Sequence, residues 1–332
     1  MKKVRMLLSF LLCVVILFSL VGCSTDKNGS EKSTSESSKP TPPQVQRVSL
    51  GTAGSGGAYF VMGAAMTNLI NEKLDNIEMN AEITDGSLQN INYVASGEMD
   101  LGMSGIQTAI NAYEGKGDFK TKMDIRAMCL MHSSVIQIVA SEYSGVKKME
   151  DMKGKRVAVG APGSGARPNF EGILEFYGMS FKDFKVYDLS YTEAVDAMKD
   201  RGMDVIWAQA GLPTSAILDI ANSENIVLVP VSDDIGDKIN NKYSHLIKAT
   251  IPKGTYNNEE DIPTMAVPNI MFCAADADEE VIYQITKCIF ENLDKLAGSH
   301  EAFESMSIEG GPTNAIPMHP GAVRYFKEVG AM

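Results

Sequence analysis

Two glycine-rich turns are the features of this sequence best suited to chemistry. Residues 51–57 read Gly-Thr-Ala-Gly-Ser-Gly-Gly, and residues 160–165 read Gly-Ala-Pro-Gly-Ser-Gly. A helix N-terminus has unpaired N–H groups and a partial positive charge, and glycine lets a ligand approach the backbone. Because each turn joins a strand-like run to a helix-like run, the pair indicates a binding site. The alternative is that both are ordinary strand-to-helix turns with serine caps.

The same turns lack the residues that would make them catalytic. Residues 160–165 mimic a phosphate-binding loop, but Ala166 and Arg167 stand where that loop needs Lys followed by Ser or Thr. Tyr59 occupies the third glycine position of a dinucleotide-binding fingerprint. No Gly-x-Ser-x-Gly nucleophile motif is present, and the four histidines have no metal-ligand spacing. We therefore expect a binding protein that is not an enzyme and needs no cofactor or metal.

Three side chains beside the turns are further candidates for ligand contact. Tyr59 opens the first helix, where its ring is suited either to a cleft wall or to the core. Arg167 lies in the first turn of the second helix, where a cation is unfavourable unless an anionic group compensates. A ligand carboxylate and Glu171 are its two candidate partners. Trp207 ends a strand just before Gln209, and core packing is the favoured interpretation.

Strand and helix patterns alternate along the chain. Strands are expected at residues 47–51, 77–83, 99–103, 156–160, 204–207 and 226–229, with two further apolar runs at 125–131 and 135–140 separated by polar residues 132–134. Helices are expected from residue 58, at 87–95, from 191 and at 279–296, the last being the longest amphipathic pattern. This alternation predicts an α/β fold with mostly parallel sheets.

The strand–turn–helix unit occurs twice, beginning at Val48 and at Val157. We expect one α/β lobe around each copy, because the folded part is near the upper size limit for a single core. Residues 47–133 together with 249–332 are assigned to a discontinuous first lobe, and residues 134–248 to the second. The two turns would then face a ligand cleft between the lobes.

The N-terminus has the layout of a lipoprotein signal peptide over residues 1–22. Basic residues precede an apolar stretch that closes on Gly22 and Cys23, and Cys23 is the expected lipidation site. An uncleaved signal anchor is the alternative. Residues 23–46 are rich in Ser, Thr, Lys, Glu and Pro, which predicts a disordered tether. The expected location is therefore outside the cytoplasm, on the bacterial cell membrane, held only by the lipid.

Charge and cysteine content narrow the partners. The chain has 30 Lys and Arg against 42 Asp and Glu, a net charge of -12, which argues against nucleic acid. Cys129, Cys273 and Cys288 all lie in apolar runs, which favours buried free thiols; one disulfide among them is the alternative.

A series of short motifs resembles the TAXI family of TRAP transporter solute receptors. The motifs occur in family order at residues 54–59 (Gly-Ser-Gly-Gly-Ala-Tyr), 87–90 (Ser-Leu-Gln-Asn), 95–101 (Ala-Ser-Gly-Glu-Met-Asp-Leu), 111–115 (Asn-Ala-Tyr-Glu-Gly), 152–157, 160–165, 210–213, 254–256 and 319–325. The resemblance extends over residues 47–332.

This resemblance implies a type II periplasmic-binding-protein fold, in which two α/β lobes close over a ligand. It also implies delivery of the ligand to a multi-span TRAP permease driven by an ion gradient. Family ligands are small carboxylates, glutamate among them, so a small anionic or zwitterionic solute is the expected partner. Carried over by motif, the ligand-facing residues are Gly54, Ser55, Gly56, Tyr59, Asn90, Gln107, Ser164, Gly165 and Gln209. Relatives often carry a hydroxyl or amide at the position of Ala166, so glutamate itself does not follow by analogy.

Two other functions use the same features. An exported ligand-sensing or adhesin module would have this fold without a transport role. A receptor for an inorganic oxyanion would also use glycine-serine turns at helix N-termini. A neighbouring gene for a multi-span permease would favour transport over sensing or adhesion.

Overall fold

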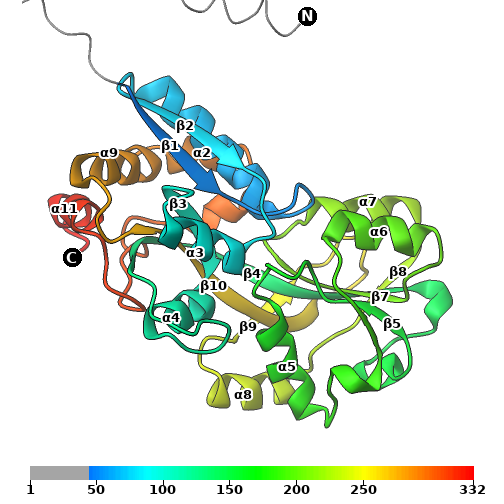
Figure 1. Ribbon diagram of the computed structural model, residues 1–332. Helices are drawn as coiled ribbons and strands as arrows, with labels where there is room; N and C mark the ends of the chain where they lie inside the picture. The colour runs from blue at the N-terminus through cyan, green and yellow to red at the C-terminus, as the bar shows by residue number, and fades with distance from the viewer. Residues whose placement is uncertain (1–44) are drawn as a thin grey trace, which may run out of the picture. The chain divides into compact units, whose positions relative to one another are not determined.

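One mixed β-sheet runs through residues 45–332, the part of the chain that this computed structural model describes (Figure 1). Its strands are β1 (Gln46–Gly51), β2 (Ile77–Glu82), β3 (Leu101–Gly105), β4 (Ile125–Ser141), β5 (Arg156–Ala158), β6 (Lys185–Tyr187), β7 (Val205–Ala210), β8 (Ile226–Leu228), β9 (Ile247–Ile251) and β10 (Ile262–Ala274). The helices are α2 (Ala58–Lys73), α3 (Ser87–Ser96), α4 (Ile106–Glu114), α5 (Arg167–Phe176), α6 (Tyr191–Lys199), α7 (Ser215–Ser223), α8 (Asp233–Lys242), α9 (Glu279–Phe290), α10 (Leu293–Ala297) and α11 (Pro320–Glu328). The predicted signal peptide, Cys23 and nearly all of the tether lie outside the described residues.

The sheet is parallel at both ends and antiparallel in the middle. Its strand order is β2-β1-β3-β10-β4-β7-β5-β6. The strands β2, β1 and β3 run parallel, as do β7, β5 and β6. The pairs β3–β10, β10–β4 and β4–β7 are antiparallel. The prediction of mostly parallel strands was therefore wrong for the centre, because β4 and β10 pair with each other in opposite directions.

The strands β4 and β10 are the longest in the sheet and form its centre. The two apolar runs expected around residues 132–134 belong to one continuous strand, so the expected interruption was wrong. The side chain of Asn269, fully buried on β10, explains this: it donates to the backbone oxygen of His132 at 2.8 Å and to Ser134 Oγ at 2.9 Å. The side chain of Asn269 thus satisfies the backbone oxygen of His132 and the hydroxyl of Ser134 inside the sheet. Directly after Ser134, Val135 pairs with Ala266.

The apolar core divides into two groups along these long strands. Buried side chains from Val48 to Met131 pack with those from Ile270 to Phe326, and buried side chains from Val135 to Val267 pack among themselves. Figure 1 shows α2–α4 with β1–β3 on one side of β4 and β10, and α5–α7 with β5–β8 on the other. The lobe boundaries stay a prediction. This packing favours a second boundary after Val267, where the chain returns to the first group, over the predicted boundary at residue 248.

Two helices illustrate how far the apolar pattern sets the boundaries. The longest is α2, with 16 residues, and it buries Met62, Met66, Leu69 and Ile70 as their spacing predicts. The amphipathic pattern over residues 279–296 was expected to form one long helix. It is instead split into α9 and α10, so the expected length was wrong. The side chain of Asn292 donates to the backbone oxygen of Cys288 at 2.8 Å and occupies a C-terminal acceptor of α9. Within residues 45–332 no helix has the length and apolar content to cross a membrane.

Candidate ligand-binding pocket

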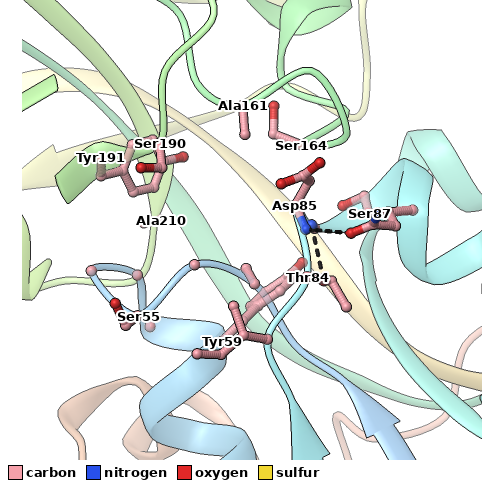
Figure 2. Close-up of a pocket in the computed structure, with 18 of the residues that line it drawn as sticks. Ser55, Tyr59, Thr84, Asp85, Ser87, Ala161, Ser164, Ser190, Tyr191 and Ala210 are labelled. Atoms are coloured by element: carbon pink, nitrogen blue, oxygen red, sulfur yellow. Dashed lines mark hydrogen bonds between the residues drawn. The ribbon is translucent and has the colours of Figure 1, made fainter. Parts of the chain in front are cut away.

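A pocket of about 560 Å³ opens where strands of both core groups end and helices begin (Figure 2). From the first group it is lined by residues 53–59, 83–87, Gln89 and Tyr93, and from the second by Ser134, Ala161, Ser164, residues 190–193, Gln209 and Ala210. Figure 2 shows Ser55 and Tyr59 across the pocket from Ser190 and Tyr191, with Asp85 and Ser87 beside the turn that carries Ser164.

Three helices begin at this pocket. Their N-terminal caps are Gly57 for α2, Gly86 for α3 and Ser190 for α6, and all three residues line it. No side chain caps the start of α2 or of α3, and neither helix has an acidic residue in its first turn. The free N–H groups and the partial positive charge at such helix starts suit a ligand group that accepts hydrogen bonds.

Six of the residues predicted to face the ligand line this pocket: Gly54, Ser55, Gly56, Tyr59, Ser164 and Gln209. They come from both glycine turns and from the end of β7, so the structure brings the two turns to one cavity. Trp207, two residues before Gln209, is buried edge to face against Phe170 with ring centroids 4.8 Å apart. Its core interpretation is confirmed.

Three other predicted residues lie outside the lining. Asn90 is fully buried and donates to the backbone oxygens of Thr52 and Met103, each at 2.8 Å. Gln107 donates to the side-chain oxygen of Asn111, one turn further along α4, at 2.8 Å. Gly165 is buried with φ of +72°, a left-handed conformation that favours glycine. Contact of these residues with a ligand stays a prediction.

Arg167 also lies outside the lining. Its guanidinium forms an ion pair with Asp188 at 3.2 Å and lies 4.8 Å from the ring centre of Phe181. In the structure Asp188, and not the expected Glu171, pairs with this cation, and contact of Arg167 with a ligand carboxylate stays a prediction. A local argument about the helix could not find Asp188, which is 21 positions away in the sequence.

Sequence reasoning missed several segments of the pocket lining. The segment Thr84–Ser87 joins β2 to α3 with the same strand–glycine–helix layout as the two turns that were recognised. Ser190 and Glu193 form a capping box at the start of α6, a pattern that is readable from Ser-x-x-Glu. Both signals were present in the sequence. Ser134 had no such signal, because it reaches the pocket only through the pairing of β4.

The buried side chain of Asn269 lies behind Tyr59 and fixes the position of its hydroxyl. The hydroxyl of Tyr59 donates to Asn269 Oδ1 at 2.7 Å, and the ring of His132 meets the Tyr59 ring edge to face at 5.8 Å. Burial raises the pKa of Tyr59 far above its usual value and lowers the pKa of His132 to about 3. Both groups are therefore uncharged at neutral pH and act as structural supports for this wall.

The second glycine turn packs directly on the start of α3. Leu88 donates its backbone N–H to the backbone oxygen of Gly163 at 2.9 Å. A Cβ atom added at Gly163 would lie 2.5 Å from Asp85 Cβ, closer than real Cβ atoms approach. On the far side of the pocket, Ala216 donates its N–H to the backbone oxygen of Gly56 at 3.2 Å. Both glycine turns thus hold the two core groups together as well as lining the cavity.

No metal or thiol chemistry is indicated for the described part of the chain. Within residues 45–332 no group of three or more His, Cys, Asp or Glu side chains could hold a metal ion. Cys129, Cys273 and Cys288 are all buried free thiols, so the interpretation as free thiols is confirmed. Burial raises the pKa of Cys129 and of Cys273 to about 12, which makes them unreactive.

The fold is that of the periplasmic binding proteins, as predicted. The alkanesulfonate-binding protein SsuA from Xanthomonas axonopodis pv. citri, bound to MOPS, aligns over 86% of this chain and 84% of its own with a TM-score of 0.52 and 15% identity. PhnD1 from Prochlorococcus marinus, in complex with methylphosphonate, aligns over 86% and 97% with a TM-score of 0.51 and 12% identity. A protein from Bordetella bronchiseptica aligns over 86% and 89% with a TM-score of 0.54 and 16% identity. At these identities the likeness establishes the fold alone.

The family is established separately from the fold. The model of the NMT1-like family matches residues 50–330, and the chain therefore belongs to the NMT1-like family. The match covers both glycine turns and every residue that lines the pocket. The narrower TAXI resemblance stays a prediction.

Proposed function

We propose that this protein is an extracytoplasmic receptor that captures a small organic solute and passes it to a membrane permease. The observation that carries the proposal is the pocket, in which serine hydroxyls, helix N-termini and tyrosine side chains from two core groups meet. Pockets of about 300–1,000 Å³ are typical of small organic ligands. The volume of about 560 Å³ therefore favours an organic solute over an inorganic oxyanion.

The ionisable groups at the pocket support binding without turnover. Burial raises the pKa of Tyr191 to about 12 and raises that of Tyr59 further, so both phenols stay protonated at neutral pH. Glu193 lines the pocket, but its carboxylate accepts the backbone N–H of Ser190 at 2.9 Å and the Ser190 hydroxyl at 2.7 Å. These bonds lower the pKa of Glu193 and weaken it as a general base.

The type of transporter is the finer part of the proposal. The ordered motifs over residues 47–332 favour a TRAP permease driven by an ion gradient, and the signal-peptide layout of residues 1–23 favours a lipid anchor at Cys23. Uptake into right-side-out membrane vesicles should then require the receptor and an ion gradient, and should proceed when ATP is depleted. Uptake that depends on ATP would instead assign the receptor to an ATP-driven importer.

Calorimetry of the purified protein against amino acids, carboxylates, sulfonates and phosphonates tests the receptor function itself. We expect saturable binding of one class, with a small carboxylate or amino acid as the first candidate, and recovery of the ligand chemically unchanged. A ligand at 100 times its Kd adds about 2.7 kcal/mol of stability, which a thermal-shift screen detects easily. Reproducible conversion of a ligand by the pure protein would contradict the proposal.

A further inference from the structure

The charges around the pocket are of one sign. Asp85 and Glu193 are the two acidic side chains in its lining, and no Lys, Arg or His is among the residues that line it. Arg167, the cation expected to meet a ligand carboxylate, is paired with Asp188 outside the lining. A solute with only negative charge would therefore meet two carboxylates without a compensating cationic side chain.

The two carboxylates differ in what they already bind. Glu193 is occupied by the backbone N–H and hydroxyl of Ser190, which it accepts at the start of α6. The carboxylate of Asp85 has no hydrogen bond or ion pair with any residue of the described range 45–332, although its backbone N–H donates to Gln89 Oε1 at 2.7 Å. Asp85 is thus the one lining charge that has no partner within the described residues.

The backbone holds Asp85 in place without neutralising it. The Thr84 hydroxyl accepts the N–H of Gly86 at 3.0 Å. Leu88, the second residue of α3, donates its backbone N–H to the backbone oxygen of Gly163. Figure 2 shows the Asp85 side chain between the segment of Thr84 and the turn that carries Ser164. Asp85 is exposed and lines the pocket, so its carboxylate is accessible to a cationic group of a solute.

Tyrosine rings complete the environment. Tyr59, Tyr93 and Tyr191 all line the pocket. The hydroxyl of Tyr191 donates to the backbone oxygen of Gln209 at 3.0 Å and accepts its N–H at 2.9 Å, and that of Tyr59 is bound to Asn269. These two hydroxyls are therefore engaged with the protein. Aromatic faces attract ammonium groups, and quaternary amines are commonly bound in such cages.

We propose that the solute carries a cationic amine, protonated or quaternary, which pairs with Asp85 and lies against the pocket tyrosines. This inference rests on the proposed receptor function and names the class of solute. An acidic group on the same solute would lie at the N-terminus of α2, whose first turn has no acidic residue and no side-chain cap.

Matched pairs of compounds test the inference, because each pair differs mainly by the amine. The purified protein is titrated calorimetrically with β-alanine and propionate, taurine and ethanesulfonate, 2-aminoethylphosphonate and ethylphosphonate, and with choline as an amine without an acid. We expect binding from amine-bearing compounds and at least about tenfold weaker binding from their amine-free partners, equivalent to about 1.4 kcal/mol.

Variants assign the effect to one carboxylate. Asp85→Asn keeps the shape and removes the charge, and it should weaken binding of the amine about tenfold or more. Glu82→Gln removes the same charge from an exposed position outside the lining and should bind as the unaltered protein does. Circular dichroism and unfolding curves confirm that both variants fold.

The outcomes separate the two proposals. Amine-free acids that bind as tightly as their amine-bearing partners, or an Asp85→Asn variant with full affinity for the amine, would overturn the amine assignment and leave the receptor function standing. Failure of every compound in this series, together with failure of the wider solute panel, would count against both.

Discussion

Gly163→Ala is the substitution that most directly tests whether the contact between the second glycine turn and α3 shapes the pocket. The backbone at Gly163 is not left-handed, so alanine meets no conformational penalty there and the effect is purely steric. The new Cβ atom would lie 2.5 Å from Asp85 Cβ and 3.3 Å from Gln89 Cβ. An ordinary contact begins near 3.4 Å, so the turn must move away from α3 by about an ångström.

The size of the effect follows from this displacement. Forcing an extra carbon into a packed contact costs about 1–3 kcal/mol. If the turn closes on α3 only when ligand is bound, this free energy should appear as ligand affinity that is about 5–150-fold lower. If the contact is equally close without ligand, the cost cancels in the affinity and the free energy of unfolding should instead fall by about 1–3 kcal/mol.

Isothermal titration and urea unfolding measure the two quantities side by side. Gly298→Ala is the matched control, because Gly298 is exposed with φ of −62° and its added Cβ meets only a backbone oxygen at 3.4 Å. The control should bind and unfold normally. Full affinity together with unchanged unfolding of Gly163→Ala would refute the reasoning, since the turn would then be free to yield.

Four further predictions concern other parts of the chain. Cys23→Ala should abolish incorporation of labelled fatty acid, and a variant that is still labelled would exclude the lipid anchor at this position. Ser55→Ala and Ser164→Ala should each remove one hydrogen bond, worth about 0.5–1.5 kcal/mol, and weaken binding about 2–12-fold by calorimetry; normal affinity in both would make these hydroxyls structural. Arg167→Ala should leave affinity unchanged and cost at most about 1 kcal/mol of stability, because its pair with Asp188 is exposed; a selective loss of carboxylate binding would restore the contact expected from the sequence. His132 has its pKa lowered from 6.5 to about 3, so the unfolded chain takes up this proton first as the pH falls, and stability should drop by up to about 1.4 kcal/mol per pH unit between about pH 6.5 and 3; His132→Gln should reduce that slope in urea titrations at several pH values, and an unchanged slope would show that other groups cause it.

Local patterns in the sequence predicted most of the elements and two of the three glycine turns at the pocket. The helix start at Ser87 and the burial of the apolar face of α2 follow from spacing alone. The continuity of β4 does not, because the backbone oxygen of His132 and the hydroxyl of Ser134 are bonded by Asn269, 137 positions beyond His132. A bond across that separation leaves no local trace in the sequence.

The candidate site divides in the same way. Ser55 and Ser164 were found because each lies inside a glycine turn that precedes a helix. Ser134 enters the pocket through strand pairing, in which Val135 is opposite Ala210, and no periodicity contains that information. For Arg167 the sequence offered a ligand carboxylate and Glu171 as candidate partners, whereas the fold supplies Asp188 from the segment after β6. Long-range partners, more than residue types, are what the sequence alone could not provide.

The pairing of Val135 with Ala266 has a consequence for the construction of new receptors. The chain leaves the first core group and returns to it at adjacent positions on β4 and β10, so residues 136–265 behave topologically as an insertion with a single point of attachment. A chimaera that takes this segment from a relative with another ligand would have to match this strand pair. It would also have to keep the backbone bonds of Leu88 with Gly163 and of Ala216 with Gly56, while one whole wall of the pocket would be replaced.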